Sequence, residues 1–172
     1  MTLPIRPARA DEAPELQEIE RSAGDRFRQV GLDGVADAEP PSAEVLAAYA
    51  RDGRSWVAVD DENRPVGFVV VDLVDGNAHV EQISVRTDRQ GVGIGRSLLV
   101  RVEGWVRENG MSALTLTTFT EVPWNRPWYE HLGFVVMDEH QIGPELRAVR
   151  DTETQHGLDP AERVCMHLEL DR

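Results

Sequence analysis

The feature that most constrains the fold is the stretch Arg-Gln-Gly-Val-Gly-Ile-Gly-Arg-Ser at positions 89–97, in which glycine occupies alternate positions. A strand-like apolar run, His79–Val85, comes before it, and a helix-like run, Arg96–Asn109, comes after it. A glycine-rich turn from strand into helix leaves several main-chain N–H groups bare at a helix N-terminus. With the helix dipole, those donors form a binding site for phosphate oxygens. The pattern therefore predicts an α/β fold that binds a phosphate-bearing cofactor.

Length and composition bound the remaining possibilities. The chain has 172 residues, of which 41% are hydrophobic, a size at which one domain buries a core without disulfides or metals. No apolar run approaches the roughly 20 residues that a membrane-spanning helix needs. The N-terminal stretch 1–16 is interrupted by charged side chains and lacks a signal-peptide core. We expect a single cytoplasmic domain over residues 1–172, without a membrane partner.

The charge balance narrows the choice of partner. The formal net charge is −13, and nucleic-acid binding needs clustered cations, so no nucleic-acid partner is expected. The acidic surface has two interpretations: it favours a cationic acceptor such as an amine, or it is simply a solvated surface.

The basic and sulfur-containing residues exclude several chemistries. All 18 basic residues are arginine, which rules out a P-loop lysine and a Schiff-base lysine and hints at a high-G+C bacterial genome. Cys165, the one cysteine, lies in the apolar run Val164–Leu170, where we expect a packed core residue rather than a nucleophile. No Cys/His spacing indicates zinc, so no metal is expected.

Hydrophobic periodicity and turn signals predict a mixed, mostly antiparallel sheet of about seven strands flanked by about four helices. Asp11 is the expected N-cap of the first helix, and Asp75-Gly76-Asn77 is a hairpin turn. Segments 24–40 and 139–160 read as irregular. The crossover from the strand at 79–85 to the next one should make those two strands parallel. The expected strands are 3–8, 55–59, 65–74, 79–85, 113–119, 134–138 and 163–170, and the expected helices are 11–24, 42–53, 96–109 and 125–132.

The glycine spacing does not match a dinucleotide fingerprint. Gly-x-Gly-x-x-Gly would need a third glycine at position 96 or 98, where the chain has Arg96 and Leu98. A nucleotide-binding oxidoreductase is thus disfavoured.

Two motifs match another superfamily. Gln90-Gly91-Val92-Gly93-Ile94-Gly95 has the form Gln-x-x-Gly-x-Gly, and Asn125–Phe134 reads Asn, then a helix ending Tyr-Glu-x-x-Gly-Phe. With a strand between them in this order, they resemble the GNAT superfamily of acetyl-CoA-dependent N-acetyltransferases. The resemblance implies a GNAT-like fold in which the two parallel strands splay apart and the pantetheine arm of acetyl-CoA inserts between them.

The resemblance also implies the cofactor contacts. Main-chain groups of the strand end should pair with the pantetheine amides, and the loop and first helical turn should hold the diphosphate. Arg89 and Arg96 add charge-assisted contacts, with a surface role for Arg89 as the alternative. Asn125 should bond the cofactor arm, or cap its helix, or both. The expected contacts are thus Ile83, Ser84, Val85, Arg89, Gln90, Gly91, Val92, Gly93, Ile94, Gly95, Arg96, Ser97 and Asn125.

The chemistry expected of such an enzyme is attack of an amine on a thioester. Tyr129 matches the tyrosine that protonates the leaving thiol, its alternative being a packed aromatic residue. Glu81 is the first candidate for the base and His79 the second; the alternatives are an exposed strand carboxylate and a surface residue at the hairpin end. Glu20, at the end of the first helix, is a weaker candidate for binding a cationic acceptor.

The resemblance leaves the acceptor open between a small-molecule amine and a peptide amine. Phe27 and the segment 24–40 lie where this family usually closes over the acceptor. A homodimer is compatible with the resemblance, and no sequence feature decides it. The alternative function is a non-catalytic acyl-CoA-binding sensor of the same fold.

Overall fold

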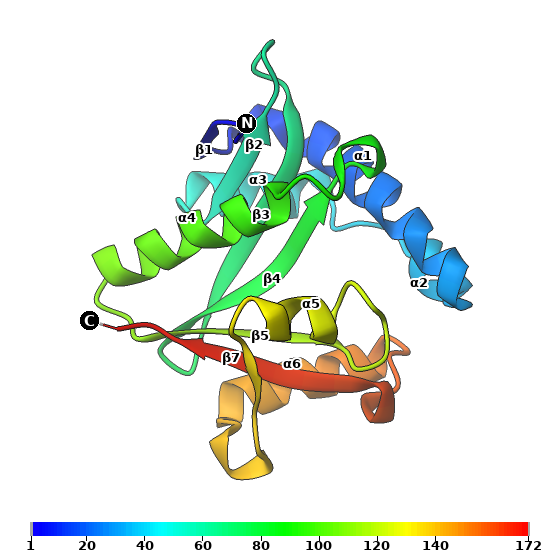
Figure 1. The fold of residues 1–172 in the computed structure, drawn as a ribbon, viewed down its shortest axis with the longest axis vertical. Coiled ribbons are helices and arrows are strands. Elements are labelled where there is room, and N and C mark those ends of the chain that lie inside the picture. The colour runs from blue at the N-terminus through cyan, green and yellow to red at the C-terminus, as the bar shows by residue number, and fades with distance from the viewer. Residues whose placement is uncertain (1, 172) are drawn as a thin grey trace. The chain divides into compact units, whose positions relative to one another are not determined.

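A computed structural model describes residues 2–171 of the chain, which divide into two compact units (Figure 1). The first unit comprises Met1–Val71 and Glu81–Val102, and the second comprises Asp72–Val80 and Glu103–Arg172. Strands β3 (Pro65–Val74) and β4 (Asn77–Val85) and helix α4 (Ile94–Glu108) run from one unit into the other.

The first unit joins helices to an antiparallel part of the sheet. Strand β1 (Ile5–Pro7) pairs with β2 (Ser55–Val59), and β2 pairs with β3, in both cases antiparallel. The helices that begin in it are α1 (Ala13–Gly24), α2 (Asp33–Ala36), α3 (Ala43–Arg51) and α4, with short 3₁₀ helices η1 (Ala10–Glu12), η2 (Asp25–Val30) and η3 (Thr87–Arg89). All five residues of β2 are buried, as its continuous apolar sequence requires.

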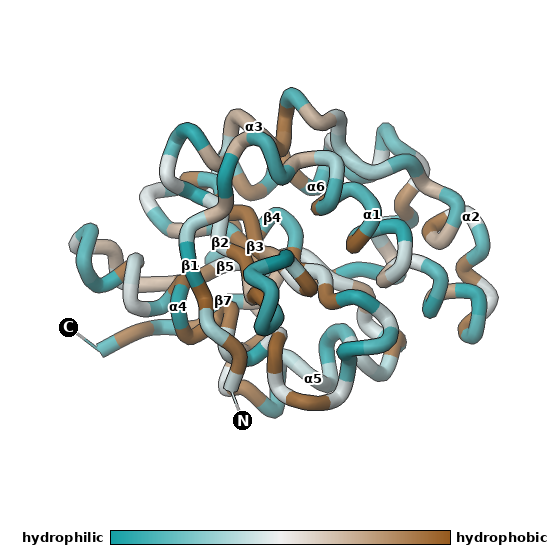
Figure 2. The backbone as a smooth tube through the Cα atoms, turned by 90° about the horizontal axis from the view of Figure 1, so that it is seen from above, coloured by the Kyte–Doolittle hydropathy of each residue, from teal (hydrophilic) through white to brown (hydrophobic). Residues whose placement is uncertain are grey.

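The hydrophobic core of the first unit forms between α1, α3 and these strands. Leu16 of α1, Leu46 of α3 and Phe68 of β3 belong to one cluster and are at most 1% exposed. Burial of each such side chain contributes about 1.5–3 kcal/mol. Along α1 in Figure 2, brown hydrophobic positions recur among teal hydrophilic ones, the pattern of a helix with one buried face.

The second unit holds strands β5 (Ala113–Phe119), β6 (Val135–Val136) and β7 (Arg163–Glu169) with helices α5 (Arg126–His131) and α6 (Pro144–Gln155) and 3₁₀ helices η4 (Glu139–Gln141) and η5 (Pro160–Glu162). Strand β4 runs parallel to β5, where Ala78 pairs with Leu114 and His79 with Thr115. Strand β7 is antiparallel to both β5 and β6. Val74, Leu146 and Cys165 form the buried core cluster on the α6 side.

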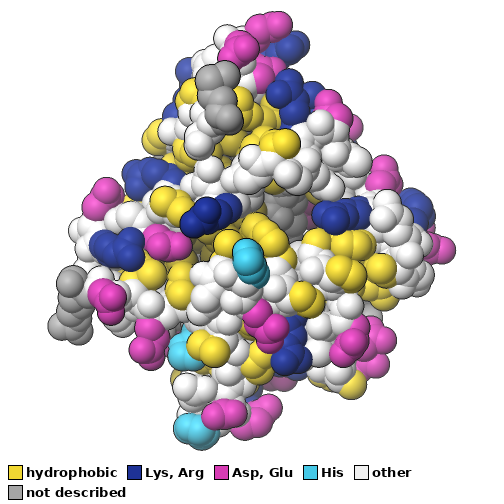
Figure 3. Space-filling view, in the orientation of Figure 1, with side chains coloured by type: hydrophobic (Ala, Val, Ile, Leu, Met, Phe, Trp, Pro, Cys, Tyr) yellow, Lys and Arg dark blue, Asp and Glu magenta, His cyan; other side chains and the backbone are white. Residues whose placement is uncertain are grey.

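The strands follow the order β1-β2-β3-β4-β5-β7-β6 in one seven-stranded sheet. This mixed sheet, with a parallel β4–β5 pair and four main helices, confirms the predicted fold class. None of the described helices is long and apolar enough to cross a membrane. In Figure 3, arginine and acidic side chains are interspersed over the visible face rather than gathered by sign.

Three local predictions are wrong. The segment 139–160 contains the twelve-residue helix α6, and the segment 24–40 contains η2 and α2. Asp11 does not cap the first helix: it lies inside η1, and Glu12 precedes the first residue of α1. The prediction of a single domain over the whole chain stays a prediction.

Helix α6 begins where it does because the β3–β4 hairpin caps it. Asp75 has a φ of 50° and Gly76 a φ of 77°, the left-handed pair of a tight hairpin turn. The Asp75 carboxylate accepts bonds from the main-chain N–H groups of Glu145 (3.0 Å) and Leu146 (2.9 Å). The N-cap of α6 therefore comes from a side chain 70 positions away in the sequence.

Candidate active site

The glycine loop between β4 and α4 has the geometry that its sequence predicts. Gly91 and Gly93 have φ angles of 79° and 88°, a region that costs most other residues free energy. A Cβ atom added at either position would have no neighbour within 4 Å. The glycines are thus required by the backbone conformation, and the space beside them is open.

Bare donors gather at the start of α4. The first helical bond runs from Ser97 N to Gly93 O (3.1 Å), and the Ser97 hydroxyl donates to the same oxygen. The N–H groups of residues 93–96 therefore have no acceptor within the helix. Four N–H donors and the positive end of a helix of 15 residues form an anion site.

The side chains of Gln90 and Arg26 hold the loop by hydrogen bonds. Gln90 donates from Nε2 to Val85 O (2.9 Å), which ties the loop to the end of β4. Its Oε1 accepts from Arg26 Nη1 at 3.5 Å. Gln90, predicted as a cofactor contact, thus has its side chain engaged within the protein, and it stays a candidate through its main chain.

The end of α1 is fastened to the segment that enters the loop. Thr87 donates to Ser22 twice, from its N–H to Oγ (3.0 Å) and from its hydroxyl to the main-chain oxygen (2.6 Å). The two hydroxyl oxygens also lie 2.8 Å apart. The last turn of α1 and the approach to the loop are therefore joined within the first unit.

The two predicted phosphate-binding arginines are available. Within residues 2–171, neither Arg89 nor Arg96 forms an ion pair with a carboxylate, whereas most arginines of the chain do. Arg96 is exposed in the first turn of α4, and Arg89 is half-buried at the end of η3. Both flank the bare N–H groups in sequence, as a diphosphate requires. Val92, between the two glycines, is 70% exposed.

Strand β4 carries the remaining predicted residues of the first unit. Ser84 is 4% exposed, and its Oγ accepts from Gln82 Nε2 at 2.8 Å. Ile83 and Val85 are half-buried, and Glu81 is exposed. Gly67 of β3 allows strand β4 to approach closely, because a Cβ atom at this position would lie 3.2 Å from Ser84 O.

His79 lies in the second unit and is a core residue rather than a surface one. It is 1% exposed, and its Nδ1 lies 2.9 Å from Thr115 Oγ1. Burial lowers its pKa below the usual value, against the smaller opposing effects of Asp72 and Glu153. His79 is thus neutral at pH 7 with one ring nitrogen already engaged.

Tyr129 is buried in α5 of the second unit. It is 8% exposed, and its ring packs edge-on against Trp128 (centroids 4.9 Å apart) and Phe134 (5.5 Å). Its hydroxyl makes no hydrogen bond to any residue from 2 to 171. Burial raises the pKa of the phenol well above its usual value, and Arg163 opposes the rise. The side chain is therefore a neutral proton donor at neutral pH.

Asn125 supports the start of α5 by its main chain. Its carbonyl accepts from Tyr129 N (3.0 Å), and its Oδ1 lies 3.4 Å from Phe119 N. The side chain does not cap α5, so the capping alternative is wrong.

One cluster was missed by the sequence analysis because α6 was missed. Glu153 of α6 accepts from Thr117 Oγ1 (2.7 Å) and from Arg163 Nη2 (2.9 Å). The Arg163 guanidinium also lies 4.6 Å from the centre of the Phe119 ring. The positive charge of Arg163 lowers the pKa of Tyr129, against the larger effect of burial.

Cys165 lies in the core of the second unit, as predicted. It is 1% exposed, and burial raises the pKa of its thiol despite a contact with Arg150. A neutral, sealed thiol is a poor nucleophile.

Comparisons with known proteins agree with this geometry. The chain is similar to N-acetylglutamate synthase from Neisseria gonorrhoeae, complexed with coenzyme A and N-acetyl-glutamate: TM-score 0.74 and 19% identity, over 100% of this chain but only 36% of that one. An acetyltransferase of the GNAT family from Staphylococcus aureus has TM-score 0.74 and 16% identity, covering 98% of this chain and 99% of that one. The PaiA N-acetyltransferase from Thermoplasma acidophilum, in complex with coenzyme A, has TM-score 0.72 and 16% identity, covering 99% and 100%.

These likenesses concern the fold. The family model for the acetyltransferase (GNAT) family matches residues 16–134, which is more than half of the sequence and includes the glycine loop and Tyr129. The chain therefore belongs to the GNAT family of acetyltransferases.

Proposed function

We propose that this enzyme transfers the acetyl group of acetyl-CoA directly to a primary amine of a small molecule or peptide. The observation that carries the proposal is the loop at 90–96. Its two glycines in the left-handed region have open space beside them, and four bare N–H groups follow.

In this proposal the diphosphate of acetyl-CoA binds the N–H groups of residues 93–96, with Arg89 and Arg96 as charged partners. The pantetheine amides pair with main-chain groups of Ile83 and Val85, and Asn125 bonds the same arm. The pairing of β4 with β5 at Ala78 and His79 supports this arrangement, because both proposed partners follow that stretch of β4.

The chemical step joins three proton transfers to one substitution. An amine is a nucleophile only when neutral, so a base removes its proton. We assign this to Glu81, which is exposed and accessible to water, with His79 second because its Nδ1 is engaged. The nitrogen then attacks the carbonyl carbon, the C–S bond breaks, and Tyr129 gives its proton to the departing thiolate. The second proton of the attacking nitrogen passes through water to the Tyr129 phenolate, which leaves a neutral amide and restores the phenol.

Two further assignments belong to the proposal. Direct transfer is supported by the burial of Cys165, which leaves that thiol unsuited to carry an acetyl group. A single catalytic domain is supported by the family match at 16–134, which includes residues of both units.

The test has a binding arm and a turnover arm. Calorimetry should detect acetyl-CoA, and Gly91→Ala should weaken its binding by at least about tenfold, because the loop no longer presents its N–H groups. Gly110→Ala is the matched control. Its φ of 70° and open surroundings impose the same backbone strain after the other end of α4.

The turnover arm uses a panel of amines and measures the released thiol. Release of coenzyme A that depends on an amine supports the proposal. Tight binding of acetyl-CoA without turnover of any amine would instead indicate an acyl-CoA sensor. No detectable binding at millimolar concentration would overturn the proposed function altogether.

A further inference from the structure

Glu20 stands where the buried face of α1 calls for an apolar side chain. Ala13 and Leu16 of this face are 2% and 1% exposed, and Glu20 follows Leu16 by four residues, one turn further on the same side. The carboxyl is mostly enclosed, and its Oε2 is sealed from solvent. A charged group at such a position needs an explanation in pairing or in function.

The carboxyl of Glu20 has no partner. Four buried side-chain atoms of residues 2–171 lack a hydrogen bond: Glu20 Oε2, Ser55 Oγ, Glu153 Oε1 and Arg163 Nε. Glu153 and Arg163 are paired with each other through their other atoms, and the serine is neutral. Among the described residues, Glu20 alone is an acid in this group without a hydrogen bond or ion pair.

Its location joins it to the cofactor loop. Ser22, two residues further along α1, carries the hydrogen bonds to Thr87 at the approach to the loop. Arg26, six residues after Glu20 and in η2, reaches Gln90 of the loop itself. Glu20 thus belongs to the last turns of α1, which are fastened to the loop within the first unit.

Burial is the main influence on the pKa of the Glu20 carboxyl. Burial raises the pKa of Glu20 to about 7, and Arg21 lowers it slightly. No other charged group has a resolved effect on it. The elements packed against α1 are α2, α3, η1, η2 and η3, and their other charged residues are Asp11, Glu12, Asp25, Arg26, Arg28, Asp33, Glu44, Arg51, Asp88 and Arg89.

We propose that Glu20 binds a second positive charge of the acceptor, so that the preferred substrates are diamines or other amines with an additional cationic group. A carboxylate that bonded the reacting ammonium would hold its proton and oppose the attack. A second cation has no such conflict, and it supplies the partner that Glu20 lacks. This inference rests on the acetyltransferase activity proposed above and names its substrate class.

The surface near α1 favours the same class of substrate. A groove of about 400 Å³ on the other side of α1 is lined by four acidic residues and one arginine: Glu18, Asp25, Asp37, Glu39 and Arg21. These carboxylates form ion pairs with Arg21 and Arg28, which they outnumber by two. With a net charge of −13 for the chain, the protein attracts cations and repels acidic acceptors over distances of about a Debye length.

The experiment compares 1,4-diaminobutane with 1-aminopentane, which has the same number of non-hydrogen atoms and one charge fewer. We expect the intact protein to prefer the diamine by at least about tenfold in kcat/KM. Glu20→Gln should remove this preference through the KM of the diamine and leave the KM of the monoamine and the affinity for acetyl-CoA unchanged. The control Glu15→Gln removes the same charge from an exposed position on α1 outside that groove and should keep the preference.

The pH dependence separates recognition from a structural role. The ratio of kcat/KM for the two amines largely cancels their shared need for a neutral reacting nitrogen. In the intact protein the ratio should rise up to about tenfold per pH unit below pH 7 and level off above it, because only ionised Glu20 binds the cation. In Glu20→Gln it should be flat.

The outcomes distinguish the inference from the function on which it rests. Amine acetylation with no preference for the diamine, or with a preference that survives Glu20→Gln, overturns the inference and leaves the function standing. Where no amine is turned over, the proposed function fails. Calorimetry of 1,4-diaminobutane on the intact protein and on Glu20→Gln then decides the role of Glu20. If Glu20→Gln does not fold, Glu20→Asp replaces it and should weaken the preference while keeping its pH dependence.

Discussion

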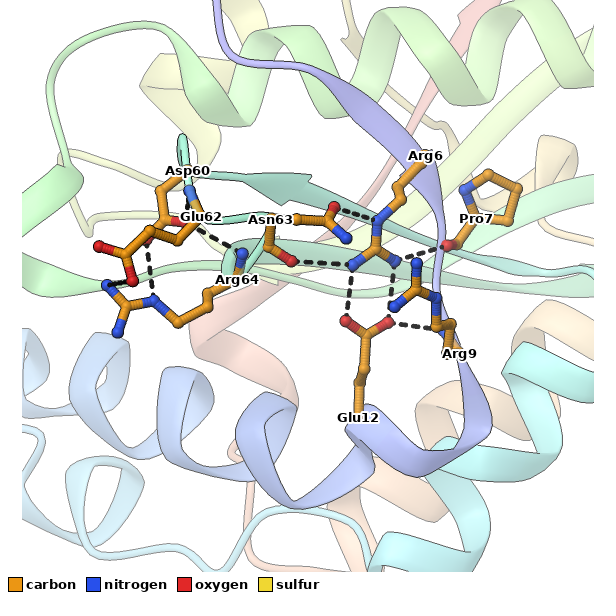
Figure 4. Close-up of polar contacts among 8 residues, drawn as sticks. All are labelled: Arg6, Pro7, Arg9, Glu12, Asp60, Glu62, Asn63 and Arg64. Atoms are coloured by element: carbon orange, nitrogen blue, oxygen red, sulfur yellow. Dashed lines mark hydrogen bonds and ion pairs between the residues drawn. The ribbon is translucent and has the colours of Figure 1, made fainter.

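The glutamates near the two ends of α1 have pKa values shifted in opposite directions. Glu12, just before the helix, accepts two bonds from Arg6 (2.9 and 2.8 Å) and one from Arg9 N (2.8 Å), as Figure 4 shows. Burial alone would raise its pKa, but these bonds outweigh burial and lower it. Glu20, near the other end, has no such bonds, and burial raises its pKa to about 7.

Pairing with Arg6 and Arg9 reverses at Glu12 the rise in pKa that burial causes at Glu20. Glu12 is only 7% exposed, less than Glu20, and yet it is the stronger acid. A paired carboxylate fixes the chain, since it closes the junction between β1 and α1. An unpaired buried carboxylate is stabilised when a cation binds it, and the folded chain does not supply that cation.

The largest effect should come from Tyr129, the unpaired buried acid of the second unit. Tyr129→Phe removes the proposed proton donor and keeps the ring packing, so kcat should fall roughly 10- to 1000-fold with little change in acetyl-CoA affinity. Tyr49→Phe, at the other tyrosine of the chain, is the control for the loss of a hydroxyl. Unchanged turnover would remove Tyr129 from the mechanism.

Glu12 tests the paired side of the comparison. Glu12→Ala leaves Arg6 without its carboxylate and should lower the free energy of unfolding by about 2–4 kcal/mol, measured by urea denaturation at pH 7. The exposed Glu15→Ala on the same helix should change it by less than about 0.5 kcal/mol. Equal effects of the two substitutions would contradict the role given to the ion pair.

Glu20 should affect stability with the opposite sign. Its folded pKa of about 7 lies above the usual glutamate value of 4.5, so the folded state binds more protons between these values and its stability falls as the pH rises through them. Glu20→Gln removes this loss and should be more stable than the intact protein by about 1–3 kcal/mol at pH 8. The gain should shrink toward pH 4.5, and a gain that does not depend on pH would argue against a raised pKa.

Glu12 has the reverse pH dependence. Its folded pKa is depressed, so its contribution is present above the unfolded value and is lost as the pH falls through the folded one. Urea denaturation of Glu12→Gln and Glu20→Gln between about pH 3 and pH 8 should therefore give difference curves of opposite slope. The change for Glu12→Gln should lie below about pH 4.5 and that for Glu20→Gln between about pH 4.5 and 7.

The smallest effect should come from Asp75, the paired carboxylate of the second unit. Asp75→Asn keeps a residue that tolerates the φ of 50° but loses the charge and one acceptor at the start of α6, so the free energy of unfolding should fall by about 0.5–1.5 kcal/mol. Asp151→Asn, exposed within α6, serves as the control. An unchanged free energy would mean that α6 does not depend on this cap.

The sequence predicts the elements whose signals are local. Ser55–Val59, Pro65–Val74 and Ala113–Phe119 are found with their predicted bounds, because each is rich in apolar and β-branched residues and lies between turn residues. Helix α6 escaped prediction because Leu146 is its one buried residue. Its N-terminus is set by Asp75, a contact that no local pattern contains.

The features of the candidate site likewise divide into those that local sequence predicts and those that it does not. The glycine loop follows from its own residues, since positive φ angles and bare N–H groups are properties of a short segment. The burial of His79 and the ion pair of Glu153 with Arg163 depend on elements distant in sequence. The unpaired state of Glu20 belongs to this second class, because it reflects what the surrounding elements leave out.

The three hydroxyl contacts between Ser22 and Thr87 couple two segments to which we assign different substrates. Binding of the coenzyme to the loop should also order the end of α1. The amine that binds afterwards then loses less conformational entropy and binds more tightly. We therefore expect ordered addition, coenzyme first. By thermodynamic reciprocity, a bound amine should in turn raise the affinity for the coenzyme by the same factor.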